Sequence, residues 1–249
     1  GQKIRGGIVG GAGYTGGELT RLLINHPNVD IAFIHSKSNA GNFVYEVHSD
    51  LLGDTDLKFT DHLSEQIDVL FLCLGHGDSK KFLASANISS TIKIIDLSQD
   101  FRLKSDLSSQ DGFIYGLPEV NRDQISQAKN IANPGCFATS IQLALLPLAS
   151  ESLLNSEIHI NATTGSTGAG QSLSQTSHFT WRNNNLSIYK AFGHQHLNEI
   201  GETLTKLQPG FNSPVHFIPQ RGNFTRGILS AVYLKTDLDL QKALDLFQR

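Results

Sequence analysis

The first thirty-five residues place a glycine-rich turn between two apolar segments, and this arrangement limits the possible folds more than any other feature. Residues 3–9 have the composition of a short β-strand, and residues 10–17 contain five glycines. Residues 18–25 have a helical pattern, and residues 29–35 read as a second strand. Together they form a βαβ unit, in which the strands run parallel and the helix covers the sheet. The chain is therefore expected to begin with an α/β domain.

The same alternation continues through the first half of the chain. Strand-like runs recur at residues 69–74 and 92–96, with a helical stretch at residues 79–86 between them. Strands that alternate with helices indicate a parallel sheet covered by helices. We therefore expect a Rossmann-type domain over residues 1–135.

After residue 135 the predicted strands are no longer separated by regular crossover helices. This pattern favours an α+β domain over residues 136–249, with a mixed or antiparallel sheet. The expected segments are a helix near 137–153, a strand at 157–163, a Gly/Ser/Thr-rich loop at 164–172, a helix near 195–207, strands at 215–219 and 227–235, and a helix from residue 239.

The first glycine-rich turn has the spacing of a phosphate-binding loop. Glycines at such positions let the backbone approach a phosphate, and the helix that follows presents its positive end. A tight strand-to-helix turn can use glycine for steric reasons alone. Its place at the first βα turn favours a dinucleotide, with contacts from Gly10, Gly13, Tyr14, Thr15 and Gly16.

The end of the second predicted strand indicates which dinucleotide is bound. Sites for NAD place an Asp or Glu here to accept the ribose 2′-hydroxyl. This chain instead has Ser36, Lys37 and Ser38, two hydroxyls and a cation, which suit a 2′-phosphate. NADP is the expected cofactor, and a solvated loop is the alternative interpretation.

Cys136 follows Asn133-Pro134-Gly135 and precedes a run of apolar residues with helical spacing. A cysteine at a helix N-terminus meets a partial positive charge that stabilises its thiolate, which is the nucleophilic form. A buried, inert cysteine is the alternative. The turn before the cysteine and the nucleotide-binding pattern upstream favour a nucleophile.

A second cluster of polar residues begins at His194. His196 and Glu199 stand three apart and share one face of a helix, so the carboxylate can orient the imidazole as a general acid–base. His194 lies off that face, at the helix entrance. Surface histidines are one alternative and zinc ligands another, but neither cysteine has a metal-ligand spacing from these histidines, so no metal is expected.

Three further residues stand where ligands collect, at strand ends. Arg102 follows the strand at 92–96 and Arg226 precedes the strand at 227–235, so either can bind an anion. His76 follows the strand at 69–74. A nucleophilic cysteine, a histidine, a hydride-carrying cofactor and an anion-binding arginine fit reduction of an activated acyl group through a thioester, with the first backbone N–H groups of the helix stabilising the oxyanion.

Composition excludes several classes of protein. The chain has 249 residues and a formal net charge of −3, without the basic stripe of a nucleic-acid-binding protein. It shows two cysteines, no secretory leader and no long apolar run, which predicts a cytoplasmic protein without a membrane segment. Exposed sheet in the second domain predicts a homo-oligomer, a dimer or tetramer.

With these residues in place, the chain resembles the N-acetyl-γ-glutamyl-phosphate reductase family of arginine biosynthesis. The Asn-Pro-Gly-Cys stretch followed by His-x-His-x-x-Glu is the most specific part of the resemblance. It implies NADP-dependent reduction of an acyl phosphate to a semialdehyde and inorganic phosphate, with Cys136 as nucleophile, His196 as base and Glu199 orienting it. His194 is the less favoured base. The implied substrate contacts are Arg102, Asn133, Ser166 and Arg226, and the implied further cofactor contacts are His76 and Gly168.

The chain also departs from the family pattern. Phe137-Ala138 replaces Tyr-Pro after the cysteine, Gln171 replaces a basic residue, and Pro219-Gln220 replaces Pro-His. The acyl group therefore stays open among N-acetylglutamyl, N-succinylglutamyl, aminoadipyl and aspartyl phosphates, and a non-catalytic NADP-binding sensor is the alternative from another class. The family continues for several dozen residues beyond Arg249, so we expect the second domain to be incomplete at its C-terminus.

Overall fold

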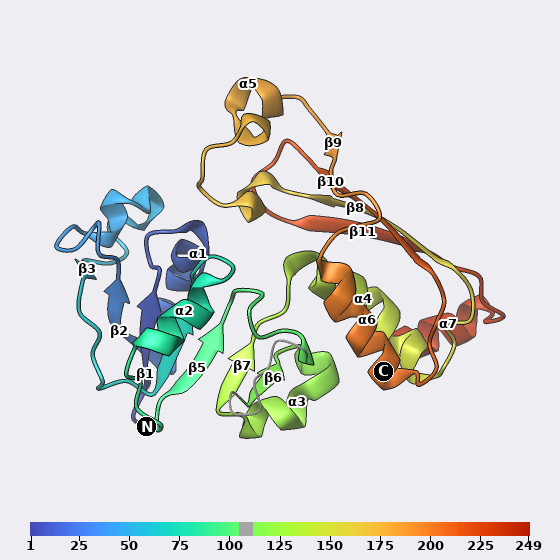
Figure 1. Cartoon of the computed structure of the whole chain (residues 1–249), viewed down its shortest axis with the longest axis horizontal. Helices are drawn as coiled ribbons and strands as arrows, with labels where there is room; N and C mark the ends of the chain where they lie inside the picture. The colour runs from blue at the N-terminus through green and yellow to red at the C-terminus, as the bar shows by residue number, and fades with distance from the viewer. Residues whose placement is uncertain (105–111) are drawn as a thin grey trace. The chain divides into compact units, whose positions relative to one another are not determined.

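The computed structural model describes residues 1–104 and 112–249, which form two compact units (Figure 1). The first unit comprises Gly1–Asn133 and the second Pro134–Arg249. No helix in the described part of the chain is long and apolar enough to cross a membrane.

The first unit is built on a parallel sheet. Within its described residues, seven strands lie in the order β3-β2-β1-β4-β5-β7-β6. All their pairings are parallel. The strands are β1 (Ile4–Val9), β2 (Val29–His35), β3 (Phe59–Thr60), β4 (Val69–Leu72), β5 (Lys93–Asp96), β6 (Phe113–Tyr115) and β7 (Asn130–Ala132).

Helices connect these strands and cover the sheet. They are α1 (Tyr14–Leu23), α2 (Asp78–Ser85) and α3 (Pro118–Gln127), with short 3₁₀ turns η1 (Val44–Glu46) and η2 (Ser49–Leu51). The chain reverses its direction of travel across the sheet at β1, because β2 pairs on one side and β4 on the other. Ligands of doubly wound sheets bind at the carboxyl ends of strands at such a switch point.

The helix after the first turn begins earlier than the sequence predicts. α1 starts at Tyr14, whereas the pattern predicted a helix from residue 18. Gly16 is therefore helical and packs directly on the turn, since a Cβ there would lie 2.6 Å from the Gly10 carbonyl oxygen. Glycine composition predicts a turn, but here the first helical residues need glycine for close packing.

The second unit packs two long helices against a four-stranded mixed sheet. The strands lie in the order β11-β8-β10-β9, and β8 pairs parallel with β10 but antiparallel with β11. The predicted α/β fold with a second, mixed-sheet domain is confirmed. The strands are β8 (Ile158–Thr164), β9 (Ser187–Ile188), β10 (Val215–Arg221) and β11 (Ile228–Tyr233). The helical elements are α4 (Cys136–Ser150), η4 (Ser166–Ala169), η5 (Gln175–Ser177), α5 (Phe179–Arg182), α6 (His196–Leu207) and α7 (Leu240–Phe247).

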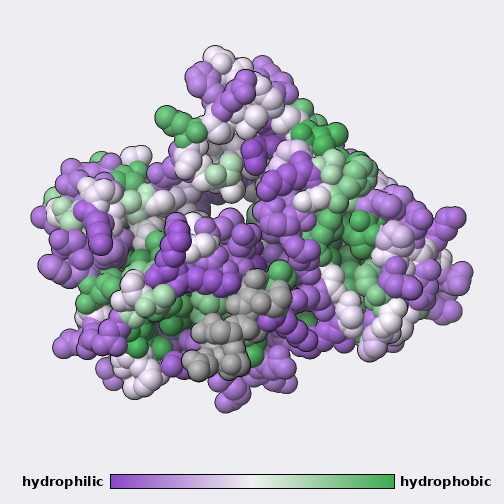
Figure 2. All heavy atoms as spheres, in the orientation of Figure 1, coloured by the Kyte–Doolittle hydropathy of each residue, from purple (hydrophilic) through white to green (hydrophobic). Residues whose placement is uncertain are grey.

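The core of the second unit lies between α4, α6 and one face of this sheet. Ile141 and Leu145 from α4, Ile200 from α6 and Phe217 from β10 are fully or almost fully buried in one cluster. Along β8, buried and exposed residues alternate at its start, so its second face points away from the helices. Figure 2 shows hydrophobic residues at the surface over the sheet of this unit.

Candidate active site

Cys136 is the first residue of α4, as the sequence predicts. Gly135 precedes it as an extended N-cap residue, and no acidic side chain occupies the first turn. The cysteine is exposed, where the positive end of the helix favours its thiolate. Cys73 differs, because burial raises the pKa of its thiol to about 12. Of the two cysteines, Cys136 is therefore the one suited to nucleophilic attack.

The imidazole of His196 lies directly against the backbone that precedes this nucleophile. A Cβ added to Gly135 would overlap Nε2 of His196 and would lie 2.6 and 2.7 Å from two of its ring carbons. His196 itself is buried at the first position of α6. The absence of a side chain at Gly135 is therefore what lets the His196 ring pack against the residue that precedes the cysteine.

Glu199 holds the same glycine from one turn further along α6. Its Oε2 accepts a hydrogen bond of 3.0 Å from the Gly135 backbone N–H, and its side chain is buried. The sequence pattern predicted that this carboxylate orients the histidine. The structure adds a contact that the sequence did not indicate, in which Glu199 secures the backbone next to Cys136.

Phe137 is the centre of an aromatic cluster around the two histidines. The side chain is 1% exposed, and its ring contacts those of Tyr189, His194, His196 and Phe217. The departure from the family pattern at this position therefore lies in the core. Its ring supplies the apolar surroundings in which both imidazoles sit.

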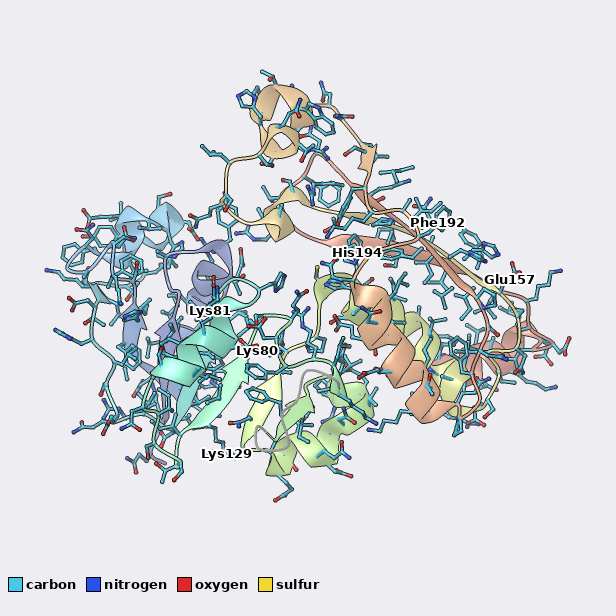
Figure 3. The ribbon with its side chains drawn as sticks, in the orientation of Figure 1. Lys80, Lys81, Lys129, Glu157, Phe192 and His194 are labelled. Atoms are coloured by element: carbon cyan, nitrogen blue, oxygen red, sulfur yellow. The ribbon has the colours of Figure 1, made fainter. Side chains whose placement is uncertain are left out.

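His194 differs from His196 in its hydrogen bonding and charge. Figure 3 shows it where the chain enters α6. Its Nδ1 accepts a 3.1 Å hydrogen bond from the His196 backbone N–H, so this nitrogen carries no proton. Burial lowers the pKa of His194 to about 4, and Lys190 adds to the effect. The His194 ring therefore stays neutral near pH 7 and uses one nitrogen to hold the start of α6.

The lowered pKa of His194 predicts a pH-dependent stability. Between about pH 6.5 and pH 4 the unfolded chain binds a proton at this histidine that the folded chain does not, so stability falls as pH falls through this window. In His194→Asn this contribution is removed. We expect the urea midpoint to drop less between pH 7.5 and pH 5 in the variant than in the wild type. Equal drops in both proteins would contradict the buried, neutral state.

Ser166 and Arg226 belong to two loops that are held together in the second unit. The backbone N–H of Ser166 donates to the Phe224 carbonyl at 2.8 Å, and the Thr167 hydroxyl donates to the Thr225 carbonyl at 2.6 Å. Arg226 follows in the second loop and is exposed. These bonds place both predicted substrate contacts beside the carboxyl end of β8. Gly168 lies in η4 within the first loop and is also exposed.

The glycine-rich turn of the first unit has the shape of a phosphate cradle. Gly10 has a φ of +79°, and a Cβ there would overlap the Cys73 carbonyl oxygen. Gly13 caps α1 without a side-chain hydrogen bond, and the first turn of that helix holds no acid. Side chains at these glycine positions would fill the space that a pyrophosphate needs. Tyr14 and Thr15 are the first residues of α1, whose N-terminus favours an anion. These residues fit a dinucleotide.

The His48 side chain packs against this turn, a contact that the sequence did not predict. One ring nitrogen, Nε2, is 2.7 Å from the Gly11 carbonyl oxygen, and the ring packs where a Cβ of Gly17 would lie 2.6 Å away. The side chain is buried. Nothing in the local sequence marks this residue, because its partner is 37 positions away.

Loss of the His48 contact should weaken cofactor binding more than the chemical step. His48→Ala removes the partner of the Gly11 carbonyl and leaves a void beside α1, which loosens the cradle. We expect the KM for the dinucleotide cofactor to rise by about tenfold with kcat within about twofold of the wild type. Steady-state kinetics with the exposed His62→Ala as control will measure this. An unchanged KM in a folded variant would exclude the positioning role.

The other predicted cofactor residues of the first unit stand at the carboxyl ends of its strands. Ser36 follows β2, and the Asn39 amide donates to the hydroxyls of Ser36 and Ser38 at 3.1 and 3.2 Å. Lys37 is exposed between them. His76 follows β4, and its Nδ1 accepts a 3.1 Å hydrogen bond from the Gln99 backbone N–H.

Arg102 has a different setting from the one expected of a substrate ligand. It is 8% exposed, and its guanidinium donates to two backbone carbonyls, that of Asn133 at 2.9 Å and that of Leu97 at 3.1 Å. The Asn133 backbone N–H in turn donates to the Asp96 carbonyl at 2.8 Å. Arg102 therefore secures the last residue of the first unit, three positions before the nucleophile.

Two family models match the two units of the chain. Residues 5–128 match the family described as semialdehyde dehydrogenase, NAD binding domain, and residues 136–249 match semialdehyde dehydrogenase, dimerisation domain. An aspartate semialdehyde dehydrogenase II from Vibrio cholerae, solved with ASA, shares the fold with a TM-score of 0.72 at 18% identity, covering 100% of this chain and 80% of its own.

Relatives of much higher sequence identity show which group of semialdehyde dehydrogenases the chain belongs to. N-acetyl-gamma-glutamyl-phosphate reductases of Phocaeicola vulgatus and Bacteroides thetaiotaomicron are 58% and 56% identical over 246 residues, which is 98% of this chain. The chain spans 76% of the length of each. It therefore belongs to the N-acetyl-gamma-glutamyl-phosphate reductase family of semialdehyde dehydrogenases.

Proposed function

We propose that this chain catalyses the NADP-dependent reduction of N-acetyl-γ-glutamyl phosphate to N-acetylglutamate semialdehyde and phosphate through a thioester on Cys136. The observation that carries the proposal is the arrangement around Gly135. The His196 ring packs against this glycine, the glycine N–H is bonded to Glu199, and the next residue is the exposed cysteine at the start of α4.

The first chemical step is acyl transfer to sulfur. His196 accepts the thiol proton, and the Cys136 sulfur attacks the carbonyl carbon of the acyl phosphate. The S–C bond forms, the bond from carbon to the phosphate oxygen breaks, and inorganic phosphate leaves. Negative charge on the carbonyl oxygen develops near the positive end of α4, which stabilises it.

The second step reduces the thioester to the aldehyde. A reduced nicotinamide, when bound, supplies a hydride to the thioester carbon. The S–C bond then breaks as the carbonyl re-forms, and the proton held at His196 returns to the Cys136 sulfur. Glu199 keeps the backbone before the sulfur in one position through both steps.

The substrate and cofactor contacts are proposed from their places in the fold. Ser166 and Arg226 lie together in the paired loops of the second unit and suit the anionic groups of the substrate. Asn133 precedes the Pro-Gly-Cys turn, and Arg102 acts on it through the backbone. The proposed pyrophosphate contacts come from the glycine turn and the start of α1: Gly10, Gly13, Tyr14, Thr15 and Gly16. The proposed contacts to the ribose 2′-phosphate are Ser36, Lys37 and Ser38. The remaining proposed cofactor contacts are His76 and Gly168.

The preference for NADP rests on Lys37. In Lys37→Glu a carboxylate replaces the cation, repelling a 2′-phosphate and offering an acceptor to a 2′-hydroxyl. We expect kcat/KM for NADPH to fall by at least about tenfold, while that for NADH holds or rises. The exposed Lys3→Glu, elsewhere in the first unit, serves as the charge-matched control. An unchanged ratio of the two cofactors would show that Lys37 does not contact the 2′-phosphate.

Self-association is proposed through the sheet of the second unit, which matches the dimerisation domain of the family. Apolar side chains are exposed on it or beside it, among them Ile188, Leu229 and Tyr233. Large apolar patches of this kind are typical of subunit contacts. We propose a homo-oligomer in the cytoplasm, a setting in which both cysteines stay reduced.

A substrate panel tests the function. Phosphate-dependent reduction of NADP by N-acetylglutamate semialdehyde is compared with that by the N-succinylglutamate, aminoadipate and aspartate semialdehydes. The proposal predicts the highest kcat/KM for the N-acetyl substrate. Preference for another semialdehyde would change the assigned acyl group, and tight NADP binding without turnover of any would favour a sensor.

A further inference from the structure

A cluster of two histidines and a glutamate lies on the second unit outside the machinery described above. We propose that Glu157, His159 and His216 bind a divalent transition-metal ion, with Zn²⁺ as the best match. Their three donor atoms lie within 4.8 Å of one another. The proposal rests on backbone register, donor spacing and ligand chemistry, and it is independent of the proposed reaction.

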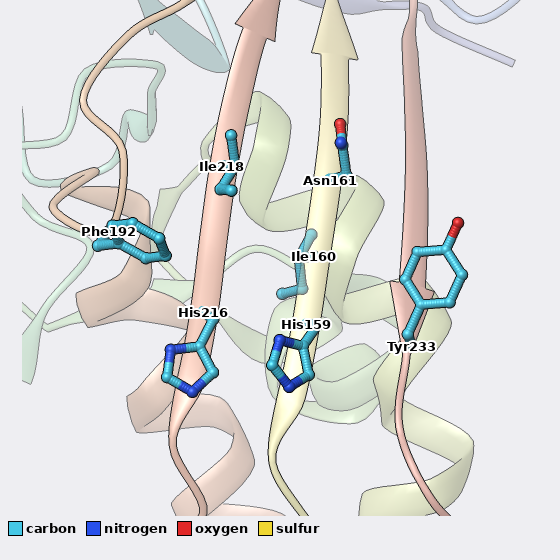
Figure 4. A pocket seen from close by; sticks show the side chains of 7 residues that line it. All are labelled: His159, Ile160, Asn161, Phe192, His216, Ile218 and Tyr233. Atoms are coloured by element: carbon cyan, nitrogen blue, oxygen red, sulfur yellow. The ribbon is translucent and has the colours of Figure 1, made fainter.

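Strand pairing sets the three side chains on one face. His159 of β8 and His216 of β10 are direct partners in the parallel register. Glu157 precedes His159 by two positions, the spacing that returns a side chain to the same face of an extended chain. The imidazole rings stack with centroids 4.8 Å apart and planes 26° apart. Figure 4 shows the two rings side by side at the same level of the two strands.

The distances between donor atoms fit a tetrahedral metal site. Oε2 of Glu157 is 3.5 Å from Nε2 of His159 and 3.6 Å from Nε2 of His216. Metal-to-ligand bonds of about 2.0–2.2 Å at tetrahedral angles put donors about 3.3–3.6 Å apart. The carboxylate already has this spacing from both imidazoles. Glu157 and His159 are exposed and His216 is half-buried, so rotation of these side chains can bring the two imidazoles to the same spacing.

The donor set selects the class of ion. Two imidazoles and a carboxylate are the three protein ligands of many zinc sites, in which a fourth position stays open. Ca²⁺ and Mg²⁺ prefer oxygen ligands, so they are disfavoured here. The histidines also line a surface hollow of about 420 Å³ with Phe192, Ile218 and Tyr233. Water, or a ligand atom of an opposing copy, can occupy the fourth position from that side.

The site is remote from the substrate loops of the same unit. It lies near the amino ends of β8 and β10, whereas Ser166 follows the carboxyl end of β8. Five residue steps from His159 to Thr164, at about 3.3 Å each, put roughly 17 Å between His159 and the end of β8, where the loop with Ser166 begins. Figure 3 likewise shows Glu157 well away from His194. A bound ion would therefore join β8 to β10 and stabilise the fold by mass action, without entering the reaction.

Titration of the metal-free full chain with ZnCl₂, followed by calorimetry, tests the proposal. We expect one ion per chain and a melting temperature that rises with zinc concentration. His159→Gln and His216→Gln should each weaken binding by at least about tenfold, the scale on which even supporting residues of metal sites act. The exposed His62→Gln is the matched control and should bind as the wild type does. Equal melting temperatures of all four proteins without metal show that the variants fold.

CoCl₂ provides an independent spectroscopic probe, because a cysteine ligand gives an intense thiolate charge-transfer band in the near ultraviolet. The proposed site predicts visible d–d bands without that band, and the same spectrum in Cys136→Ser. No binding at millimolar metal would overturn the proposal. Binding that survives the double replacement of His159 and His216, or that disappears in Cys136→Ser, would also overturn it.

Discussion

Cys136→Ser is expected to lower kcat by at least about 10³-fold while the KM and binding affinity for NADPH stay within about twofold. A serine hydroxyl at a helix N-terminus remains protonated near pH 7, whereas a thiol there forms the thiolate. The helix, Gly135 and the bond from Gly135 to Glu199 do not depend on sulfur, so the fold should persist. Stopped-flow measurement of semialdehyde oxidation and fluorescence titration of NADPH give the two quantities.

Cys73→Ser is the matched control for this experiment. It makes the same chemical change at a partly buried thiol whose pKa is raised to about 12, where no thiolate forms near neutral pH. Cys73→Ser should retain activity, whereas Cys136→Ser should lose it. Turnover by Cys136→Ser within about tenfold of the wild type would contradict the thioester mechanism, because a covalent intermediate on sulfur could not form.

Gly135→Ala should be nearly as damaging, although it alters no chemical group of the reaction. The added methyl would overlap the His196 ring, so the proposed base must shift from its present position against Gly135. Misplacement of a catalytic group by about 1 Å can cost about 10²-fold in rate. We expect kcat to fall by at least that factor, and stability to fall by about 1–3 kcal/mol from overpacking. Steady-state kinetics and urea unfolding measure the two effects.

Gly201→Ala separates local crowding from the general effect of adding a methyl group. Gly201 lies in α6 with His196, and a Cβ there meets no atom within 4 Å. Alanine in a helix is favoured over glycine by about 0.5–1 kcal/mol, so this variant should be as active as the wild type and slightly more stable. If Gly135→Ala keeps full activity, the close approach of His196 to Gly135 is not what positions the base.

Local sequence patterns predicted the framework of both units. The strand at residues 29–35 has the bounds of β2, and the helix after Pro134-Gly135 begins at Cys136. These elements were predictable because their apolar periodicity and their turn residues lie within a few positions of one another. The short strands β3, β6 and β7 gave no such signal. Two or three residues carry no periodicity, and pairing with neighbouring strands is what makes them extended.

The contacts within the candidate site were less predictable than its residues. Glu199 bonds to Gly135 across 64 positions, and His48 approaches Gly11 across 37 positions. Arg102 was predicted to bind an anion, and the structure adds hydrogen bonds from its guanidinium to the backbone carbonyls of Asn133 and Leu97. In the sequence, Phe137 is a departure from the family pattern next to Cys136. In the structure, its ring is the centre of the aromatic cluster.

By itself, the sequence determined which chemical groups the protein can use and which local elements present them: a cysteine at a helix start, a His-x-His-x-x-Glu helix and a glycine turn after the first strand. These follow from short-range rules of backbone geometry and side-chain spacing. Only the tertiary structure decided which of these groups contact one another. Glu199 accepts a hydrogen bond from the Gly135 backbone, His48 contacts the glycine turn at Gly11, and His159 lies beside His216. Such contacts join distant segments, and close packing of the whole unit, which no local pattern encodes, sets their geometry.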